Sequence, residues 1–99
     1  MNVMDSTEIE QPSLLIVDDD GVFCEVLTKA MVKRGFEVIC AHTIASAMKK
    51  VESLVPEYAI IDLKLADESG LTLVEKIRKL DPGTRIIMLT VYATIATAI

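Results

Sequence analysis

Acidic residues end two short apolar runs of the chain. Asp18 to Asp20 directly follow Leu14-Leu15-Ile16-Val17, and Asp62 directly follows Tyr58-Ala59-Ile60-Ile61. If these runs are neighbouring strands, their ends bring three or four negative charges together, and such charges repel unless a cation lies among them. Oxygen ligands without a nearby histidine or cysteine favour Mg²⁺ over zinc, and Mg²⁺ held by few carboxylates usually serves a phosphate. The cluster therefore predicts a Mg²⁺ site, and an Asp beside that ion is a candidate covalent phosphoryl acceptor.

Length and composition limit the class of protein. A chain of 99 residues suits one small domain. Although 52% of its residues are hydrophobic, no apolar run approaches the ~20 residues that cross a bilayer, and the N-terminus lacks the pattern of a signal peptide. Its two cysteines lack CxxC spacing, which favours reduced thiols and a cytoplasmic location. The net charge of -5 argues against direct binding of nucleic acid.

Apolar runs alternate with helical stripes along the chain. The runs predict strands over residues 14–17, 36–40, 58–61 and 85–89. Between them, apolar residues at helical spacing predict a helix from Gly21 that stops at Gly35, one from the N-cap Thr43 through Ser53, and one from 71 to 80. Residues 63–69 are expected to form a polar loop. Strands that alternate with such helices indicate a parallel sheet in a three-layer α/β fold.

The same pattern predicts where individual side chains lie. The first helix is expected to bury a stripe that includes Val22, Phe23 and Val26, and Met88 is expected to fill the core. Cys24 is expected to be partly exposed near the acidic cluster. The lone His42 lies in a strand-to-helix loop without partner ligands, so we interpret it as a surface residue.

Ligands of open α/β sheets lie outside the carboxyl ends of the strands. The acidic residues named above lie at those ends, and so does Thr90, which follows the fourth run. Residues 94–99 continue in helical register without a residue that prepares a C-terminus, so we interpret the chain as ending within a helix. The fourth strand is then expected to be an unprotected edge.

The chain resembles the receiver domain of two-component response regulators from about Ser13 to its end. The resemblance rests on the acidic pair Asp18 and Asp19 after the first strand, on Asp62 in Asp62-Leu63-Lys64-Leu65-Ala66-Asp67-Glu68-Ser69-Gly70, and on Thr90 in Ile87-Met88-Leu89-Thr90. Arg34-Gly35-Phe36-Glu37-Val38 and Tyr92-Ala93-Thr94-Ile95-Ala96-Thr97-Ala98 look like the branch of redox-responsive regulators of photosynthesis and respiration genes.

The resemblance implies a flavodoxin-like fold with strand order 2-1-3-4, in which the family's fifth strand and last helix are missing. Residues 1–12 are polar, acidic and without periodicity, so we expect a flexible tail there. Residues 13–99 would be the C-terminally truncated receiver domain. Asp62 would accept a phosphoryl group from a histidine kinase. Asp18, Asp19 and Asp62 would hold Mg²⁺ with the backbone carbonyl of Lys64, and Thr90 would contact a phosphoryl oxygen and act as the switch.

Departures from the family pattern carry their own expectations. The family's Lys at the end of a fifth strand is absent, and Val91 stands where the family usually has a small residue, so we expect impaired phosphorylation of this form. The uncovered fourth strand predicts a homo-oligomer through residues 86–99. The resemblance implies a signalling domain rather than an enzyme, and it implies that DNA is reached only through an output domain absent from this chain.

Two other interpretations compete for the acidic triplet. Carboxylates after a strand are often a solvated helix N-terminus, where they favour the positive end of the helix dipole. Asp18-Asp19-Asp20-Gly21-Val22 also fits the D-x-D-G-[TV] signature of haloacid-dehalogenase-type phosphatases, with Asp18 as the nucleophile. That reading leaves Asp62 unexplained. A nucleotide-binding domain is disfavoured because no Gly-rich loop follows the first strand.

Overall fold

The computed structural model describes residues 11–65 and 68–89 of the chain. The described residues form the helices and strands that follow in chain order: β1 (Ser13–Val17), α2 (Gly21–Lys33), β2 (Glu37–Ala41), α3 (Ile44–Ser53), β3 (Tyr58–Asp62), β4 (Lys64–Leu65), β5 (Glu68–Ser69), α4 (Leu71–Leu80) and β6 (Arg85–Leu89).

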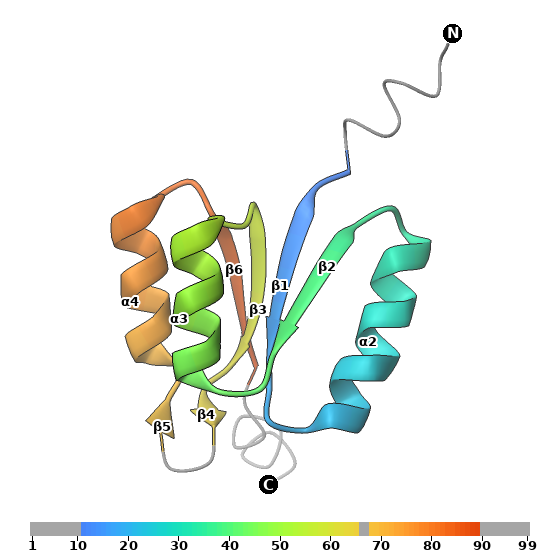
Figure 1. The fold of residues 1–99 in the computed structure, drawn as a ribbon, viewed down its shortest axis with the longest axis horizontal. Coiled ribbons are helices and arrows are strands. Elements are labelled where there is room, and N and C mark those ends of the chain that lie inside the picture. The colour runs from blue at the N-terminus through green and yellow to red at the C-terminus, as the bar shows by residue number, and fades with distance from the viewer. Residues whose placement is uncertain (1–10, 66–67, 90–99) are drawn as a thin grey trace, which may run out of the picture.

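The four longer strands form one parallel sheet in the order β2-β1-β3-β6. Helix α2 covers one face of this sheet, and α3 and α4 cover the other (Figure 1). The predicted three-layer α/β fold is therefore confirmed. Its strand order 2-1-3-4 is also confirmed, since β6 is the fourth long strand along the chain.

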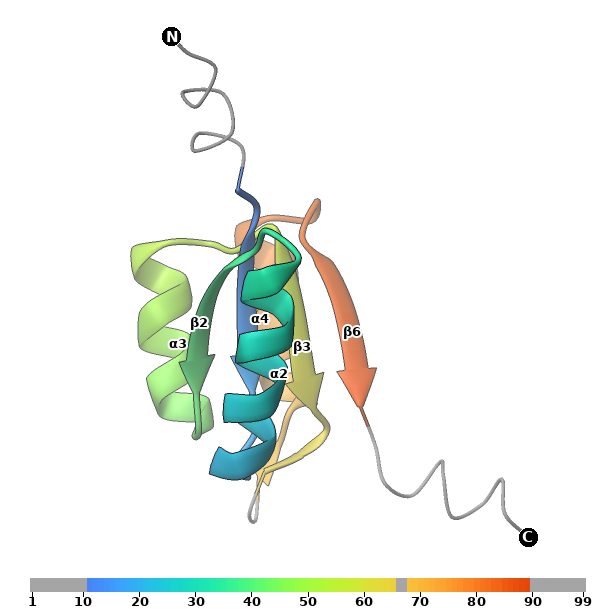
Figure 2. The same ribbon diagram turned by 90° about the vertical axis from the view of Figure 1, so that its right-hand side faces the viewer.

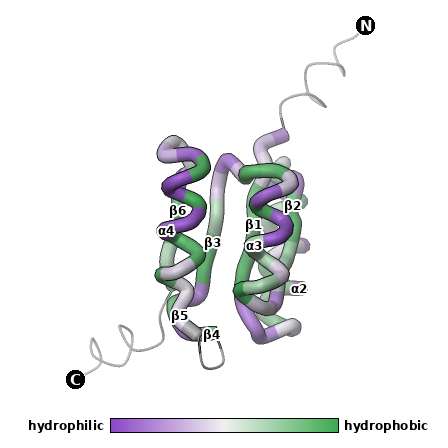
Figure 3. The backbone as a smooth tube through the Cα atoms, turned by 60° about the vertical axis from the view of Figure 1, so that its left-hand side comes forward, coloured by the Kyte–Doolittle hydropathy of each residue, from purple (hydrophilic) through white to green (hydrophobic). Residues whose placement is uncertain are grey.

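Each face of the sheet has its own hydrophobic core. Between the sheet and α3 and α4, the fully buried side chains include Ile61, Leu73 and Ile77. Between the sheet and α2, Leu14, Ile16 and Cys24 are buried. Figure 3 shows the corresponding pattern. Hydrophobic and hydrophilic residues follow one another along α4, whereas the strands are largely hydrophobic. Because both faces of β1 are covered, Leu14 to Val17 form a continuous apolar run.

Local signals in the sequence fix the ends of the helices. The carboxylate of Asp20 accepts hydrogen bonds from the amides of Val22 and Phe23 at 3.0 and 3.1 Å, which begins α2. Thr43 Oγ1 accepts a hydrogen bond from the amide of Ser46 at 3.0 Å, which confirms it as the N-cap of α3. Gly35, with φ of 95°, follows the end of α2 in a conformation that other residues rarely adopt.

The predicted buried stripe of α2 is wrong in part. Val22 and Val26 are 72% and 63% exposed, whereas Cys24, expected to be partly exposed, is 2% exposed. At 3.6 residues per turn, both valines lie about 160° around the helix from Cys24, so the helix cannot bury all three against one sheet. Met88 is also 47% exposed in β6 and is not core filler.

The segment after β3 is more ordered than the expected polar loop. Lys64 and Leu65 pair with Ser69 and Glu68 in a two-stranded antiparallel sheet. Leu65 is 2% exposed and belongs to the core beneath α3 and α4. The hairpin therefore carries the chain from the acidic end of β3 to the first turn of α4.

Strand β6 lies at one edge of the sheet, with no described helix in front of it in Figure 2. Within the described residues, no helix is long and apolar enough to cross a membrane. The predicted flexible tail lies largely, and the predicted C-terminal helix and Thr90 entirely, outside the described residues.

Candidate metal centre

The structure brings the acidic ends of β1 and β3 together. These strands are neighbours in register, with Val17 opposite Ile61, so the residues that follow them meet at one edge of the sheet. Asp18, Asp19 and Asp62 each offer a carboxylate oxygen, and these oxygens lie within 4.8 Å of one another. Three hard oxygen donors at this spacing are the ligand type that Mg²⁺ prefers.

Asp18 is the most enclosed of the three, with 9% of its surface exposed. Its Oδ1 accepts a hydrogen bond from the amide of Asp20 at 2.9 Å. Its own amide donates to the carbonyl of Ala41 at 3.1 Å. Its carbonyl oxygen accepts from the thiol of Cys24 at 3.4 Å and lies 3.0 Å from Nδ1 of His42. Contacts from α2, from the end of β2 and from its own loop thus fix this residue.

The surroundings of Asp18 disfavour its charged form. Burial raises the pKa of its carboxyl group above the ordinary value of 3.8, and the negative charges of Asp62, Asp19 and Asp20 raise it further. The hydrogen bond from the amide of Asp20 works in the opposite direction. A divalent cation among these carboxylates would offset both the burial and the repulsion, so the donor set and its electrostatics fit Mg²⁺.

Asp62 is half-buried and ends β3. Its Oδ1 accepts a hydrogen bond from the amide of Lys64 at 3.0 Å, which holds the carboxylate at the start of the β4–β5 hairpin. The next residue, Leu63, donates its amide to the carbonyl of Leu89 at 3.0 Å. The end of β6 is thereby held beside the end of β3.

Gly70 is a site residue that the sequence reasoning did not single out. It is buried, and its amide donates to the carbonyl of Leu63 at 2.8 Å. A Cβ atom at this position would overlap the carbonyl oxygen of Asp62 and press on Ile61 Cγ2 at 3.0 Å. Its backbone is ordinary right-handed helix, so glycine is needed here for space rather than for conformation. The sequence signals were its place at the end of the motif that begins at Asp62 and its position directly before a helical stripe.

The other predicted site residues have different places. Asp20, which the phosphatase signature includes, points its Oδ1 at the first turn of α2 and caps it. The amide of Lys64 contacts Asp62 as described, and the proposed role of its carbonyl stays a prediction. Thr90 lies outside the described residues. His42 is exposed as expected, but its contact with Asp18 was not foreseen, because it joins residues 24 positions apart.

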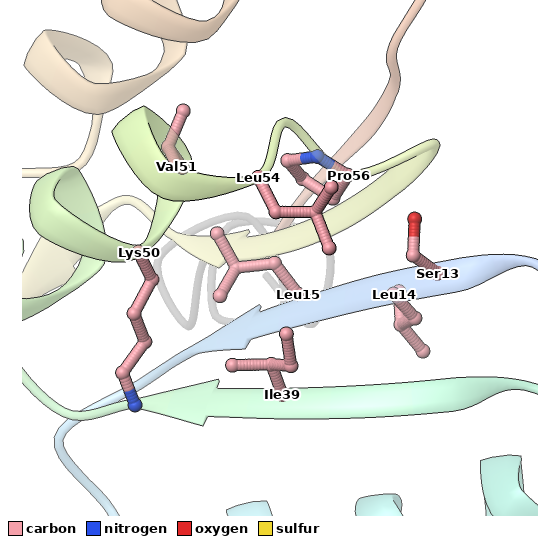
Figure 4. Close-up of a pocket in the computed structure, with 8 residues that line it drawn as sticks. All are labelled: Ser13, Leu14, Leu15, Ile39, Lys50, Val51, Leu54 and Pro56. Atoms are coloured by element: carbon pink, nitrogen blue, oxygen red, sulfur yellow. The ribbon is translucent and has the colours of Figure 1, made fainter.

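A second hollow lies away from this edge. Figure 4 shows it between α3 and strands β1 and β2. Nζ of Lys50, one of the residues that line it, donates a hydrogen bond to the carbonyl of Cys40 at 2.7 Å. Its volume of about 10 Å³ admits about one water molecule. Its lining comes from β1, from β2, from the last turns of α3 and from the loop that follows α3: Ser13, Leu14, Leu15, Ile39, Lys50, Val51, Leu54 and Pro56. It is too small and too apolar to be a second chemical site.

Comparison with known families gives one consistent result. Residues 14–99 match the model of the response regulator receiver domain. The chain is 47% identical over 90 residues to the photosynthetic apparatus regulatory protein RegA of Rhodovulum sulfidophilum, an alignment that covers 91% of this chain and 49% of that protein. The chain thus spans about half the length of the curated relatives it matches.

Solved structures give the same fold. A response regulator from Burkholderia pseudomallei, solved with a phosphorylated aspartic acid, a calcium ion and citrate, superposes with a TM-score of 0.79 at 38% identity, over 89% of this chain and 52% of that one. The response regulator TrrA from Thermotoga maritima, in complex with Mg²⁺ and BeF, superposes with a TM-score of 0.77 at 30% identity, over 88% of this chain and 76% of that one.

Proposed function

The chain belongs to the family of response regulator receiver domains, and on that premise we propose that Asp62 is its phosphoryl acceptor. In this proposal a sensor histidine kinase donates the phosphoryl group, and Asp18, Asp19 and Asp62 hold Mg²⁺ together with the backbone carbonyl of Lys64. Thr90 contacts a phosphoryl oxygen and couples the modification to the rest of the domain. The domain is a signalling module rather than an enzyme.

One observation carries the proposal. The half-buried carboxylate of Asp62 faces two further carboxylates at the carboxyl edge of a parallel sheet, with the donor oxygens within 4.8 Å. Ligands of this fold class lie at that edge. When bound there, Mg²⁺ would neutralise part of the charge on the phosphoryl oxygens.

The chain's own residues supply positioning. The amide of Lys64 donates a hydrogen bond to Oδ1 of Asp62 and so orients its carboxylate for attack. In the transfer, an oxygen of Asp62 forms a bond to phosphorus as the phosphorus–nitrogen bond to the donor imidazole breaks. Such transfers depend on alignment and charge neutralisation more than on a strong base. The closely packed backbone at Gly70 and the contacts on Asp18 provide that alignment.

The relatives suggest the wider setting. The RegA and ActR relatives are regulatory proteins about twice as long as this chain, so we propose that the domain controls a separate output domain, which makes any contact with DNA. The acidic composition agrees with this division of labour. A cytoplasmic location follows from the same proposal, because a kinase and a transcriptional output would both be met there.

A labelling experiment tests the acceptor. Incubating the full-length protein with Mg²⁺ and a small phosphodonor such as acetyl phosphate should add one phosphoryl group to Asp62, located by mass spectrometry. Asp62→Asn should abolish the label. Asp81→Asn is the matched control, because Asp81 is an exposed aspartate that follows α4, and its Oδ1 accepts a hydrogen bond from the amide of Gly83 at 2.8 Å. Label on Asp18 instead would favour the phosphatase interpretation.

We also propose that the 99-residue chain self-associates through residues 86–99. Among the described residues of that segment, Ile87 and Met88 are 57% and 47% exposed on the edge strand β6. Pairing of this edge with a second copy would cover both the apolar side chains and the open backbone groups. Light scattering across micromolar concentrations should report a dimer or larger species, and a monodisperse monomer would overturn this part of the proposal.

A further inference from the structure

The backbone of Asp18 is held by a side chain that no metal-site motif requires. Nδ1 of His42 lies 3.0 Å from the carbonyl oxygen of Asp18, in a partly buried contact between the end of β2 and the end of β1. A carbonyl oxygen can only accept, so Nδ1 carries the hydrogen and donates it. The thiol of Cys24 donates to the same oxygen at the longer distance of 3.4 Å.

We propose that His42 is a positioning residue for the Mg²⁺ site and acts through the backbone of Asp18. This inference rests on the proposed function, because it assigns His42 a part in the same site. The peptide that follows Asp18 leads directly to Asp19, the second carboxylate of the cluster. A donor that fixes the carbonyl between these two residues therefore fixes the direction in which both carboxylates leave the strand.

The other contacts of Asp18 do not replace this one. The amide of Asp18 is held by Ala41 at 3.1 Å, which continues the ladder between β1 and β2 and sets the position of the residue. The bond from the amide of Asp20 holds the side-chain Oδ1. Among the residues that the structure describes, the donors to the carbonyl are the weak sulfur donor of Cys24 and the imidazole of His42. Sulfhydryl groups are weak donors, so the imidazole is the stronger restraint on the rotation of this peptide.

Outer-shell partners of metal ligands commonly change metal affinity by about 10- to 100-fold when removed. His42 holds the backbone of a ligand rather than its carboxylate, so we expect a smaller effect, on the order of threefold to tenfold. The test compares His42→Phe, which keeps a planar ring without a donor, with His42→Asn, whose amide nitrogen can replace Nδ1. Lys49→Phe, at an exposed position of α3, controls for the added aromatic surface.

The measurement is Mg²⁺ binding to the full-length protein by calorimetry, followed by the Mg²⁺ dependence of labelling with acetyl phosphate. His42→Phe should raise the dissociation constant of Mg²⁺ threefold to tenfold and raise the half-saturating Mg²⁺ concentration equally, while the rate at saturating Mg²⁺ stays within twofold of wild type. His42→Asn and Lys49→Phe should bind like wild type. A purely structural role would instead lower the labelled fraction without shifting the half-saturating concentration.

The outcomes separate the two proposals. If wild type binds Mg²⁺ and is labelled on Asp62, but His42→Phe binds Mg²⁺ equally well, the role of His42 is overturned and the proposed function stands. Equal weakening in His42→Phe and His42→Asn also overturns it, because the donor is then not the cause. If wild type itself neither binds Mg²⁺ nor accepts the label, the proposed function fails first. Should His42→Phe not fold, His42→Leu gives the same comparison with a smaller side chain.

Discussion

Replacement of Gly70 by alanine should damage both the stability of the domain and its acidic site. The added Cβ would overlap the carbonyl oxygen of Asp62, which belongs to the backbone of β3 and cannot rotate away like a side chain. Overpacking a buried position costs about 1–3 kcal/mol, and a backbone neighbour puts this change at the upper end. For a domain of this size, 2–3 kcal/mol corresponds to a fall in Tm of roughly 10 °C or more.

Two other glycines supply matched controls for this variant. Nothing lies within 4 Å of a Cβ at Gly21, the first residue of α2, so Gly21→Ala should leave Tm unchanged or slightly raised. Gly35→Ala also meets open space, but its φ of +95° lies in the left-handed region, which costs about 1–2 kcal/mol for alanine. Gly35→Ala therefore lowers stability at a point remote from the carboxylates.

Thermal unfolding should be followed by far-ultraviolet circular dichroism, because the chain has no tryptophan. Calorimetric Mg²⁺ titration at a temperature where each variant is folded provides the second readout. Gly35→Ala should lose stability with normal Mg²⁺ affinity, whereas Gly70→Ala should lose both, because its clash displaces the backbone of Asp62. If Gly70→Ala has the same Tm and the same Mg²⁺ affinity as Gly21→Ala, the reasoning is refuted.

Three further predictions concern the buried side chains of Asp18, Thr84 and Cys24. Because the pKa of Asp18 is raised, the folded state binds the proton of this carboxyl group more tightly than the unfolded chain does. The metal-free domain therefore loses the stability that this group contributes as pH rises from 3.8 through the folded-state pKa. Asp18→Asn should accordingly gain stability relative to wild type across that window in chemical unfolding, and parallel pH curves would contradict this. Thr84 is 5% exposed, and its hydroxyl donates a hydrogen bond to the carbonyl of Pro56 at 2.8 Å. Thr84→Val should therefore lower the free energy of unfolding in urea by about 1–3 kcal/mol. A loss of stability no larger than that of the exposed control Thr72→Val would argue against this prediction. Burial, together with the neighbouring Cys40, raises the pKa of the Cys24 thiol to about 11. Iodoacetamide near pH 8 should therefore modify Cys40 before Cys24. Peptide mapping that finds Cys24 modified first would contradict this order of reactivity.

The sequence determined most of the local structure, because helices, strands and caps depend on residues close together in the chain. The helix Ile44–Ser53 begins after Thr43 as its hydroxyl indicates, and the strand Arg85–Leu89 matches its apolar run. The meeting of Asp18 and Asp62 also follows from the sequence. Alternating strands and helices impose a parallel sheet, and a parallel sheet puts the ends of its strands on one edge.

Only the tertiary structure decided which surfaces meet. The apolar residues of α2 surround much of the helix, and its packing against the sheet buries Cys24 while it leaves Val22 exposed. The approach of Gly70 to Asp62 and of His42 to Asp18 joins segments from different elements, so no local spacing encodes it. Burial of Asp18 beside the more exposed Asp19 has the same origin. Periodicity tells which residues share a face of one element, but the distance between faces is set by how all the elements pack.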